Sequence, residues 1–242
     1  TFYINEGGQY PALVLSGNAN LGYYCGTQEY EIIYQTEEVM ALLVANTTES
    51  QDWVFICCLE ELNVEPLKPE LPVKSVTLTE DFESEKPIVA FVGEDMGASF
   101  SLHYDNRARV PINESVKVCS YHKTAALYSN LSYTADDLKF DLSTNNKVRM
   151  KVFIPHFNVY EAEKLQPKVA VKLQDSSLGG NAWTTQVEIA KEDLVQGKWV
   201  ELEFDFSSAK DRVDFNKIVI QFGGEGHDAS GIFFFDDFTF SN

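Results

Sequence analysis

The chain has 242 residues, of which 44% are hydrophobic and 13% aromatic, enough apolar surface for one large or two small folded domains. Its 37 acidic residues outnumber its 19 lysines and arginines, so the formal net charge is −18 at pH 7. Nucleic-acid binding needs a basic face, and this composition therefore argues against nucleic acid as a partner. No run of about 18 apolar residues occurs, so we expect no transmembrane segment.

The first 65 residues predict a small antiparallel β-meander. Five short apolar runs between Gly, Asn, Thr and Glu turns have the length of strands: Tyr10–Ser16, Gly22–Cys25, Glu29–Gln35, Val39–Ala45 and Asp52–Leu59. Residues 1–70 contain 11 acids and one base, Lys68. Because the sequence starts abruptly in a strand-like run, we expect missing upstream strands and an exposed sheet edge. Such an acidic domain with an open edge could dock a protein partner.

Proline marks a boundary after this segment. Pro66, Pro69 and Pro72 fall within residues 66–74 and predict an extended, semi-rigid linker. The chain is therefore expected to form two domains, residues 1–65 and 75–242.

Residues 75–242 predict a large all-β domain. Ten strand-like runs follow one another: Val76–Phe82, Ser99–Tyr104, Lys117–Tyr121, Ala125–Leu131, Val148–Ile154, Val169–Leu173, Thr184–Ile189, Trp199–Phe206, Lys217–Phe222 and Phe233–Phe240. In the run after Trp199, Val200, Leu202 and Phe204 alternate with acids, which indicates a half-solvated sheet. We therefore predict a jelly-roll β-sandwich with two sheets.

The four cysteines show no Cys-x-x-Cys spacing, so a zinc or redox site is not expected. Buried free thiols are the simplest interpretation. The alternative that we would test first is a disulfide from Cys25 to Cys57 or Cys58.

Both domains resemble parts of secreted glycan-utilisation proteins of Bacteroidetes. The segments Leu15–Ile32, Thr36–Leu42 and Asp52–Phe55 are similar to a small β-domain that precedes a sugar-binding sandwich in those proteins. The second domain resembles carbohydrate-binding modules of the family-4 type, which are galactose-binding-like jelly rolls. Four motifs support this likeness: Glu80–Glu83, Asn146–Phe153, Gly197–Phe206 and Phe234–Phe238.

Carboxylates inside strand-like aromatic sequence suggest a cation site. Asp81 and Glu83 would share one face of the opening strand, and Asp236 lies on the closing strand, which pairs near the opening one in such sandwiches. The resemblance implies a structural Ca²⁺ there, with a loop ligand such as Asn106 or Asn113. Alternation separates Asp236 from Asp237, so we expect Asp237 to be solvated or paired. The alternative is that Arg107 and Arg109, which depart from the usual loop, pair with the carboxylates.

A sugar site needs an aromatic platform with hydrogen-bonding side chains around it. Trp183, in a Gly-rich polar segment, is the candidate platform, although a lone aromatic can simply cap the end of a sandwich. Trp53 and Trp199 lie in alternating apolar runs and are expected in the core. A second candidate cluster contains Tyr121, His122, Tyr128, Asn130 and Gln186, although these aromatics could equally be half-buried strand residues.

Sequence signatures of catalysis are missing. Glu80–Glu85 has Phe82 where the strand motif of retaining β-glucanases has an acid, and the four histidines show no metal-binding spacing. No nucleophile elbow or phosphate loop occurs. The leading hypothesis is therefore a non-catalytic, polysaccharide- or oligosaccharide-binding protein that is secreted, periplasmic or at the outer-membrane surface. The alternatives are a protein-interaction or scaffold module, and an accessory domain of a larger glycoside hydrolase.

Overall fold

The structure is a computed structural model, and it describes residues 30–35, 40–44, 70–96 and 99–242. The chain divides into two compact units, residues 1–70 and 71–242, and this boundary falls inside the predicted linker. Nowhere in the described ranges is there a helix long and apolar enough to cross a membrane.

In the first unit the structure describes a single hairpin. Strand β1 (Tyr30–Gln35) pairs antiparallel with β2 (Met40–Val44), with an irregularity in register between Ile32 and Tyr34. These strands match the predicted runs from Glu29 and from Val39. The other three predicted strands, Trp53 and the proposed partners Cys25, Cys57 and Cys58 lie outside the described residues.

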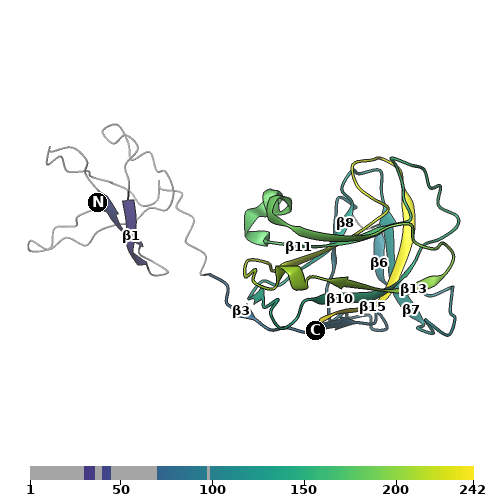
Figure 1. The fold of residues 1–242 in the computed structure, drawn as a ribbon, viewed down its shortest axis with the longest axis horizontal. Helices are drawn as coiled ribbons and strands as arrows, with labels where there is room; N and C mark the ends of the chain where they lie inside the picture. The colour runs from purple at the N-terminus through teal and green to yellow at the C-terminus, as the bar shows by residue number, and fades with distance from the viewer. Residues whose placement is uncertain (1–29, 36–39, 45–69, 97–98) are drawn as a thin grey trace, which may run out of the picture. The chain divides into compact units, whose positions relative to one another are not determined.

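The second unit is a β-sandwich, shown in Figure 1. Its elements in chain order are β3 (Val73–Lys74), β4 (Leu78–Glu80), β5 (Val92–Glu94), β6 (Phe100–Asp105), β7 (Lys117–Lys123), β8 (Asn130–Thr134), β9 (Lys139–Phe140), β10 (Lys147–Phe153), β11 (Val169–Gln174), the 3₁₀ segment η2 (Ser176–Thr185), β12 (Val187–Lys191), β13 (Trp199–Asp205), η3 (Ser207–Ala209), β14 (Lys217–Phe222) and β15 (Gly231–Ser241). Since β3 pairs with β9, the end of the predicted linker belongs to this unit.

Two sheets form the sandwich. One, which we call the β15 sheet, has the order β13-β10-β15-β7-β6, with β4 also pairing with β15. The other, the β14 sheet, has the order β12-β11-β14-β8-β5. Between them lies a core rich in phenylalanine, in which Phe82, Phe235 and Phe238 are 0% exposed. The predicted all-β sandwich is therefore confirmed.

A bulge in β15 changes the predicted alternation. The pairing of β10 with β15 shifts register between Arg149 and Lys151, and Asp237 has a φ of 47°. Before this point β15 pairs with β7, and after it with β4. As a result Phe235 and Phe238 both face the core, whereas strict alternation placed them on opposite faces.

Three other predicted strands were wrong in their bounds, among them Thr184–Ile189, since η2 extends to Thr185 and β12 begins only at Val187. The opening strand ends at Glu80, because the next residues turn and Phe82 takes a φ of 56°. Asp81 and Glu83 therefore do not share a strand face. The run Ala125–Leu131 is mostly turn, and β8 begins only at Asn130. Cys119 is a buried free thiol, as expected.

Candidate functional site

The outer face of the β14 sheet carries polar side chains in rows that cross the strands. Inward-facing Leu131, Ile220 and Val171 belong to the core, so their strand neighbours point outward. The outward residues in three successive rows are Glu94, Asn130, Gln221, Ala170 and Ala190; Val92, Ser132, Val219, Lys172 and Glu188; and Thr134, Lys217 and Gln174, with Gln186 just before β12.

Charged and amide groups on this face are largely paired with one another. Lys172 is only 4% exposed, and its Nζ lies 2.7 Å from Glu225 Oε2 and 3.3 Å from Glu188 Oε2. Glu94 accepts hydrogen bonds from the Ser132 hydroxyl at 2.8 Å and from Lys217 Nζ. Gln174 donates to Gln186 at 2.7 Å. These pairs fix the positions of the side chains that border the middle of the sheet.

Two amide side chains on the same face, one buried and one half-buried, are incompletely bonded. Asn130 Oδ1 and Gln221 Nε2 have no hydrogen-bond partner among the described residues. The two residues occupy facing positions on β8 and β14, one step beyond the Leu131–Ile220 pair. An acceptor and a donor on facing residues without partners can bind a water molecule, or a ligand hydroxyl once the side chains that cover them move aside. Sequence patterns indicated Asn130 but missed Gln221, which looks like an ordinary residue of an alternating strand.

Trp183 lies on η2 and is 64% exposed. The η2 segment follows the end of β11, a strand that Figure 1 labels. The segment begins with a cap in which Asp175 accepts a hydrogen bond from the Ser177 N–H at 2.9 Å. It bends at Gly179, whose φ of 54° and ψ of −128° favour glycine. Since η2 connects β11 to β12, Trp183 belongs to the same end of the β14 sheet as Gln174 and Gln186.

The other predicted ligand residues do not form one cluster. Tyr121 is 0% exposed, packs on Phe222 at 5.1 Å between ring centroids and donates its hydroxyl hydrogen to Ser129 O, so its assignment to a sugar site was wrong. Tyr128 is 52% exposed in the turn before β8. His122 lies on the outer face of the β15 sheet, opposite the face that carries Asn130 and Gln186.

That outer face of the β15 sheet holds a second feature, an aromatic cleft of about 480 Å³. Its ring-bearing lining residues are Tyr104, His122, Phe153, His156, Phe157, Trp199 and Phe234. Trp199, Phe153 and Phe234 come from three adjacent strands, with ring centroids 5.5 and 6.3 Å apart along the row. Trp199 is buried, as expected, yet it packs outside the sandwich core.

Two contacts shape the walls of the aromatic cleft. The Trp199 indole N–H donates to Ala108 O at 3.0 Å and holds the loop after β6 against the sheet. His156 lies directly against Gly197, where a Cβ atom would be 2.1 Å from His156 Nε2. Gly197 also has a φ of +71°, so glycine is favoured there by both space and backbone conformation.

Three of the four predicted calcium ligands approach the same segment, residues 113–117. Glu83 Oε1 accepts hydrogen bonds from the Val116 and Lys117 N–H groups, and Asn106 donates to Ser115 O at 3.0 Å. Asp81 is exposed and caps the Glu83 N–H at 3.1 Å. No group of three or more His, Cys, Asp or Glu side chains placed to hold a metal ion occurs in the described part of the chain.

Asp236 is the buried carboxylate of this region and is 0% exposed. Burial raises its pKa to about 6, although the nearby side chains of Ser115 and Asn113 act in the opposite direction. Its Oδ1 accepts the Asp237 N–H at 2.8 Å, whereas Oδ2 and the neighbouring Asn113 Nδ2 have no partner in hydrogen-bond geometry among the described residues. Asp237 pairs with Lys151 at 2.5 Å, as expected for this residue.

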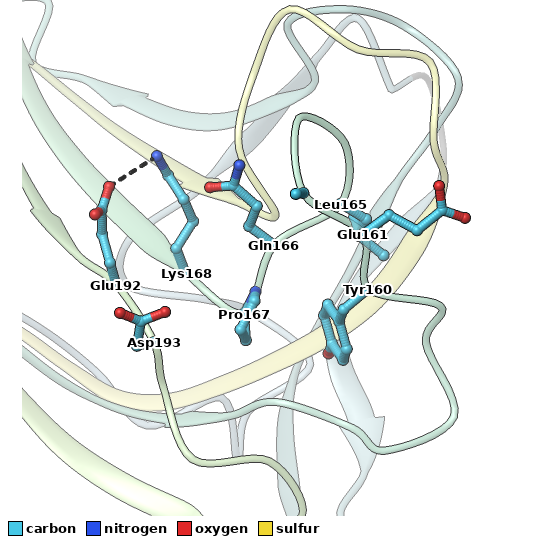
Figure 2. Close-up of a pocket in the computed structure, with 9 residues that line it drawn as sticks. Tyr160, Glu161, Leu165, Gln166, Pro167, Lys168, Glu192 and Asp193 are labelled. Atoms are coloured by element: carbon cyan, nitrogen blue, oxygen red, sulfur yellow. Dashed lines mark hydrogen bonds and ion pairs between the residues drawn. The ribbon is translucent and has the colours of Figure 1, made fainter.

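A further hollow of about 300 Å³ lies between residues 160–168 and the end of β12 (Figure 2). Figure 2 shows Lys168 turned toward Glu192, and the two charges are 3.2 Å apart. The Tyr160 hydroxyl is already bonded to Pro155 O at 2.9 Å. Because these groups already have partners, they are not free to form hydrogen bonds or ion pairs with a ligand in the hollow.

No protein-family model matches the sequence, and no curated protein matches it. Solved structures show a distant likeness. A family 27 carbohydrate-binding module of Caldicellulosiruptor saccharolyticus in complex with mannohexaose has a TM-score of 0.45 and 13% identity, over 69% of this chain and 98% of that one. A family 22 xylan-binding domain of Paenibacillus barcinonensis has a TM-score of 0.44 and 9% identity, over 68% and 99%.

A Clostridium thermocellum structure that joins a family 22 module to xylanase 10B modules, in complex with xylohexaose, has a TM-score of 0.41 and 17% identity. It matches over 68% of this chain, which spans only 28% of that one.

Proposed function

We propose that the protein binds a polysaccharide or oligosaccharide without catalysis, along the outer face of the β14 sheet. The observation that carries this proposal is a pair of covered amide atoms on facing residues, Asn130 Oδ1 and Gln221 Nε2, which have no hydrogen-bond partner in the described part of the chain. A sugar hydroxyl both donates and accepts hydrogen bonds, so one or two neighbouring hydroxyls could satisfy both atoms.

The rest of the face suits a hydroxylated ligand. Gln174, Gln186 and Glu188 provide further donors and acceptors, held in place by their mutual hydrogen bonds. Exposed Trp183, beyond the Gln174 end, would provide an apolar surface for the C–H face of a pyranose ring, and Tyr128, beyond Asn130, a second one. Because these side chains are spread over several strands, the face suits an extended chain better than a single small molecule.

The cofactor that we propose is a structural Ca²⁺ beside Asp236. Support comes from the buried Oδ2 atom of Asp236, which has no hydrogen-bond partner among the residues that the structure describes, and from the approach of Glu83 and Asn106 to the same loop. Calcium accepts irregular sets of oxygen ligands, including backbone carbonyls, so residues 113–116 could complete the shell. Bound there, the ion would fix the loop that borders the β15 sheet and would take no part in catalysis.

We further propose that the chain is part of a secreted, periplasmic or outer-membrane-surface protein of the Bacteroidetes glycan-utilisation type, with its second domain close to the family-4 modules. Support for this placement comes from the sequence motifs alone. The protein-interaction module and the accessory domain of a glycoside hydrolase remain the competing proposals, and the acidic first domain is where a protein partner would bind.

Binding to xylohexaose, mannohexaose, cellohexaose and a β-1,4-galactan oligosaccharide tests the proposal by calorimetry and affinity gels. For at least one ligand we expect a dissociation constant between about 10 μM and 1 mM, which corresponds to roughly 4–7 kcal/mol of binding free energy. Gln221→Ala and Trp183→Ala should each weaken binding at least about fivefold, which is 1 kcal/mol or more.

The matched control is Phe157→Ala, which removes a 66% exposed aromatic residue from the turn after β10, beside the outer face of the opposite sheet. Binding that Phe157→Ala abolishes, or that neither Gln221→Ala nor Trp183→Ala changes, would assign the sugar to another surface. No response to any glycan, together with capture of a stoichiometric protein partner, would favour the interaction-module alternative.

A further inference from the structure

The aromatic cleft on the β15 sheet is a separate structural feature from the proposed glycan face. The two lie on opposite outer faces of the sandwich, because both sheets turn their other faces to the common core. Its volume of about 480 Å³ is within the range of small-molecule sites and too small for a polymer chain of several rings. The inference drawn from it is therefore independent of the proposed glycan function.

Several hydrogen-bonding groups in the lining of the aromatic cleft are already bonded to neighbours. The Trp199 indole N–H is used by Ala108 O, and the Asn106 amide is bonded to Ser115 O and to the Ala108 N–H. Asp105 is paired with Lys117 at 2.8 Å. The Phe153 and Phe234 rings of the floor offer no hydrogen-bond partner, so the hydroxyls of a pyranose ring held against them would lose part of their hydration. The floor instead suits a flat apolar ring.

The floor is built as an aromatic platform. Phe153 and Phe234 are partly exposed, and Tyr104 packs beside Phe234 with ring centroids 5.6 Å apart. Burial lowers the pKa of His122, so this lining side chain is uncharged at neutral pH. Phe157 is 66% exposed at the wall formed by residues 155–157 and can cover a bound ring from the side. A ring between such groups would stack rather than form hydrogen bonds.

One cation completes the lining. Arg107 is exposed, and its guanidinium has no ion pair or hydrogen bond within the part of the chain that the structure describes. In a protein with a net charge of −18, an arginine without a partner beside an apolar cleft indicates a place where an anionic group could bind. A guanidinium binds a carboxylate through two parallel hydrogen bonds, so it selects an anionic group in a plane.

We propose that the aromatic cleft binds a small molecule with one flat, apolar ring and a carboxylate, that is, an aromatic carboxylic acid. The ring lies over Phe153 and Phe234, between Trp199 and Tyr104. The carboxylate extends toward Arg107 at the mouth. The site binds such a molecule reversibly, without covalent chemistry.

The test uses the whole chain and 4-hydroxycinnamate as the probe, with its neutral amide as a matched ligand. The three indole N–H signals in an NMR spectrum are assigned by the loss of one signal in Trp183→Phe and of another in Trp53→Phe, which leaves Trp199. We expect saturable shifts of the Trp199 signal with a dissociation constant of about 1 mM or below, in line with the free energy that a drug-sized ligand gains per atom.

Two exposed arginines provide the matched variants. Arg107→Gln should weaken 4-hydroxycinnamate about tenfold and leave the amide unchanged, because only the acid loses a charge-assisted bond. Arg109→Gln, which removes an equal charge outside the cleft lining, should change neither. Phe157→Ser should weaken both ligands.

The proposal is overturned if the Trp199 signal does not shift with either probe, or if Arg109→Gln weakens the acid as much as Arg107→Gln does. It is also overturned if xylohexaose or mannohexaose moves the Trp199 signal while the aromatic acid does not. If the sugars shift only the Trp183 signal, the titration with the aromatic acid still decides this proposal. The failure of one proposal can therefore be told apart from the failure of the other.

Discussion

The Val89 N–H donates to Glu80 Oε2 at 2.9 Å, across nine residues of sequence. The same oxygen accepts the Ile88 N–H, and Oε1 accepts the Phe82 N–H at 2.9 Å. Glu80 is 3% exposed. One carboxylate therefore satisfies the backbone of the turn after β4 and joins the segment that enters β5, so that Phe82 and Val89 both reach the core.

Replacement of Glu80 should show how much this turn depends on the carboxylate. Glu80→Gln presents an N–H₂ group where an acceptor is needed, so at least one buried N–H loses its partner. We expect the free energy of unfolding to fall by about 2 kcal/mol or more, the usual cost of a buried unpaired donor. Urea denaturation measures it, and the control Glu85→Gln, at an exposed position with no described side-chain contact, should change stability little. Equal effects in both variants would contradict the assigned role.

Gly197→Ala should destabilise the domain and disturb one wall of the aromatic cleft. The new Cβ would lie 2.1 Å from His156 Nε2, and the φ of +71° is unfavourable for alanine. Together these effects should lower the free energy of unfolding by about 1–3 kcal/mol. Gly180→Ala is the matched control, since its Cβ would meet nothing within 4 Å and its φ is not positive. If both variants melt at the wild-type temperature, the contact between His156 and Gly197 does not contribute to the stability of the domain.

Asp236→Asn should change stability in opposite directions with and without calcium. In EDTA the substitution removes a buried charge that lacks a full set of partners, so stability should rise by about 1–2 kcal/mol at pH 7. In millimolar CaCl₂ it removes a charged ligand, so the calcium-dependent rise in melting temperature should shrink or disappear.

Thermal melts of Asp236→Asn and of the exposed control Asp211→Asn, each in EDTA and in CaCl₂, measure the two effects. Asp81→Asn decides whether the fourth predicted ligand takes part. If wild-type melting temperatures in EDTA and in CaCl₂ coincide, calcium does not bind the native state and the proposed cofactor is wrong.

The sandwich itself could be predicted because strand periodicity is a local property. Alternation from Val200 to Phe204 is readable in five residues, and the structure confirms that Phe204 is buried while Glu203 is exposed. The bulge at Asp236 and Asp237 could not be predicted in this way. It depends on β15 changing its partner from β7 to β4, a long-range event that one strand's sequence does not encode.

The candidate sites were predicted less well, for the same reason. Composition indicates that Tyr121 and His122 could both bind a sugar, yet consecutive strand residues face opposite ways, and only the sheet order decides which one reaches the core. Gln221 and Phe234 had no distinguishing signal in the sequence. Their roles arise from neighbours on other strands, Asn130 for the first and Phe153 for the second.

His122 should make stability depend on pH. Its pKa is lowered from the ordinary value of 6.5 because burial in the aromatic cleft disfavours the charged ring. Between its folded-state pKa and 6.5 the unfolded chain therefore binds more protons than the folded one. The stabilisation due to neutral His122 is present above pH 6.5 and is lost as the pH falls through the folded-state pKa.

Urea denaturation between pH 7.5 and 5 measures this loss. The free energy of unfolding should fall less steeply with decreasing pH in His122→Gln than in the wild type. An NMR titration of the His122 ring gives the folded-state pKa directly. A midpoint at or above 6.5, or parallel stability curves for the two proteins, would contradict this prediction.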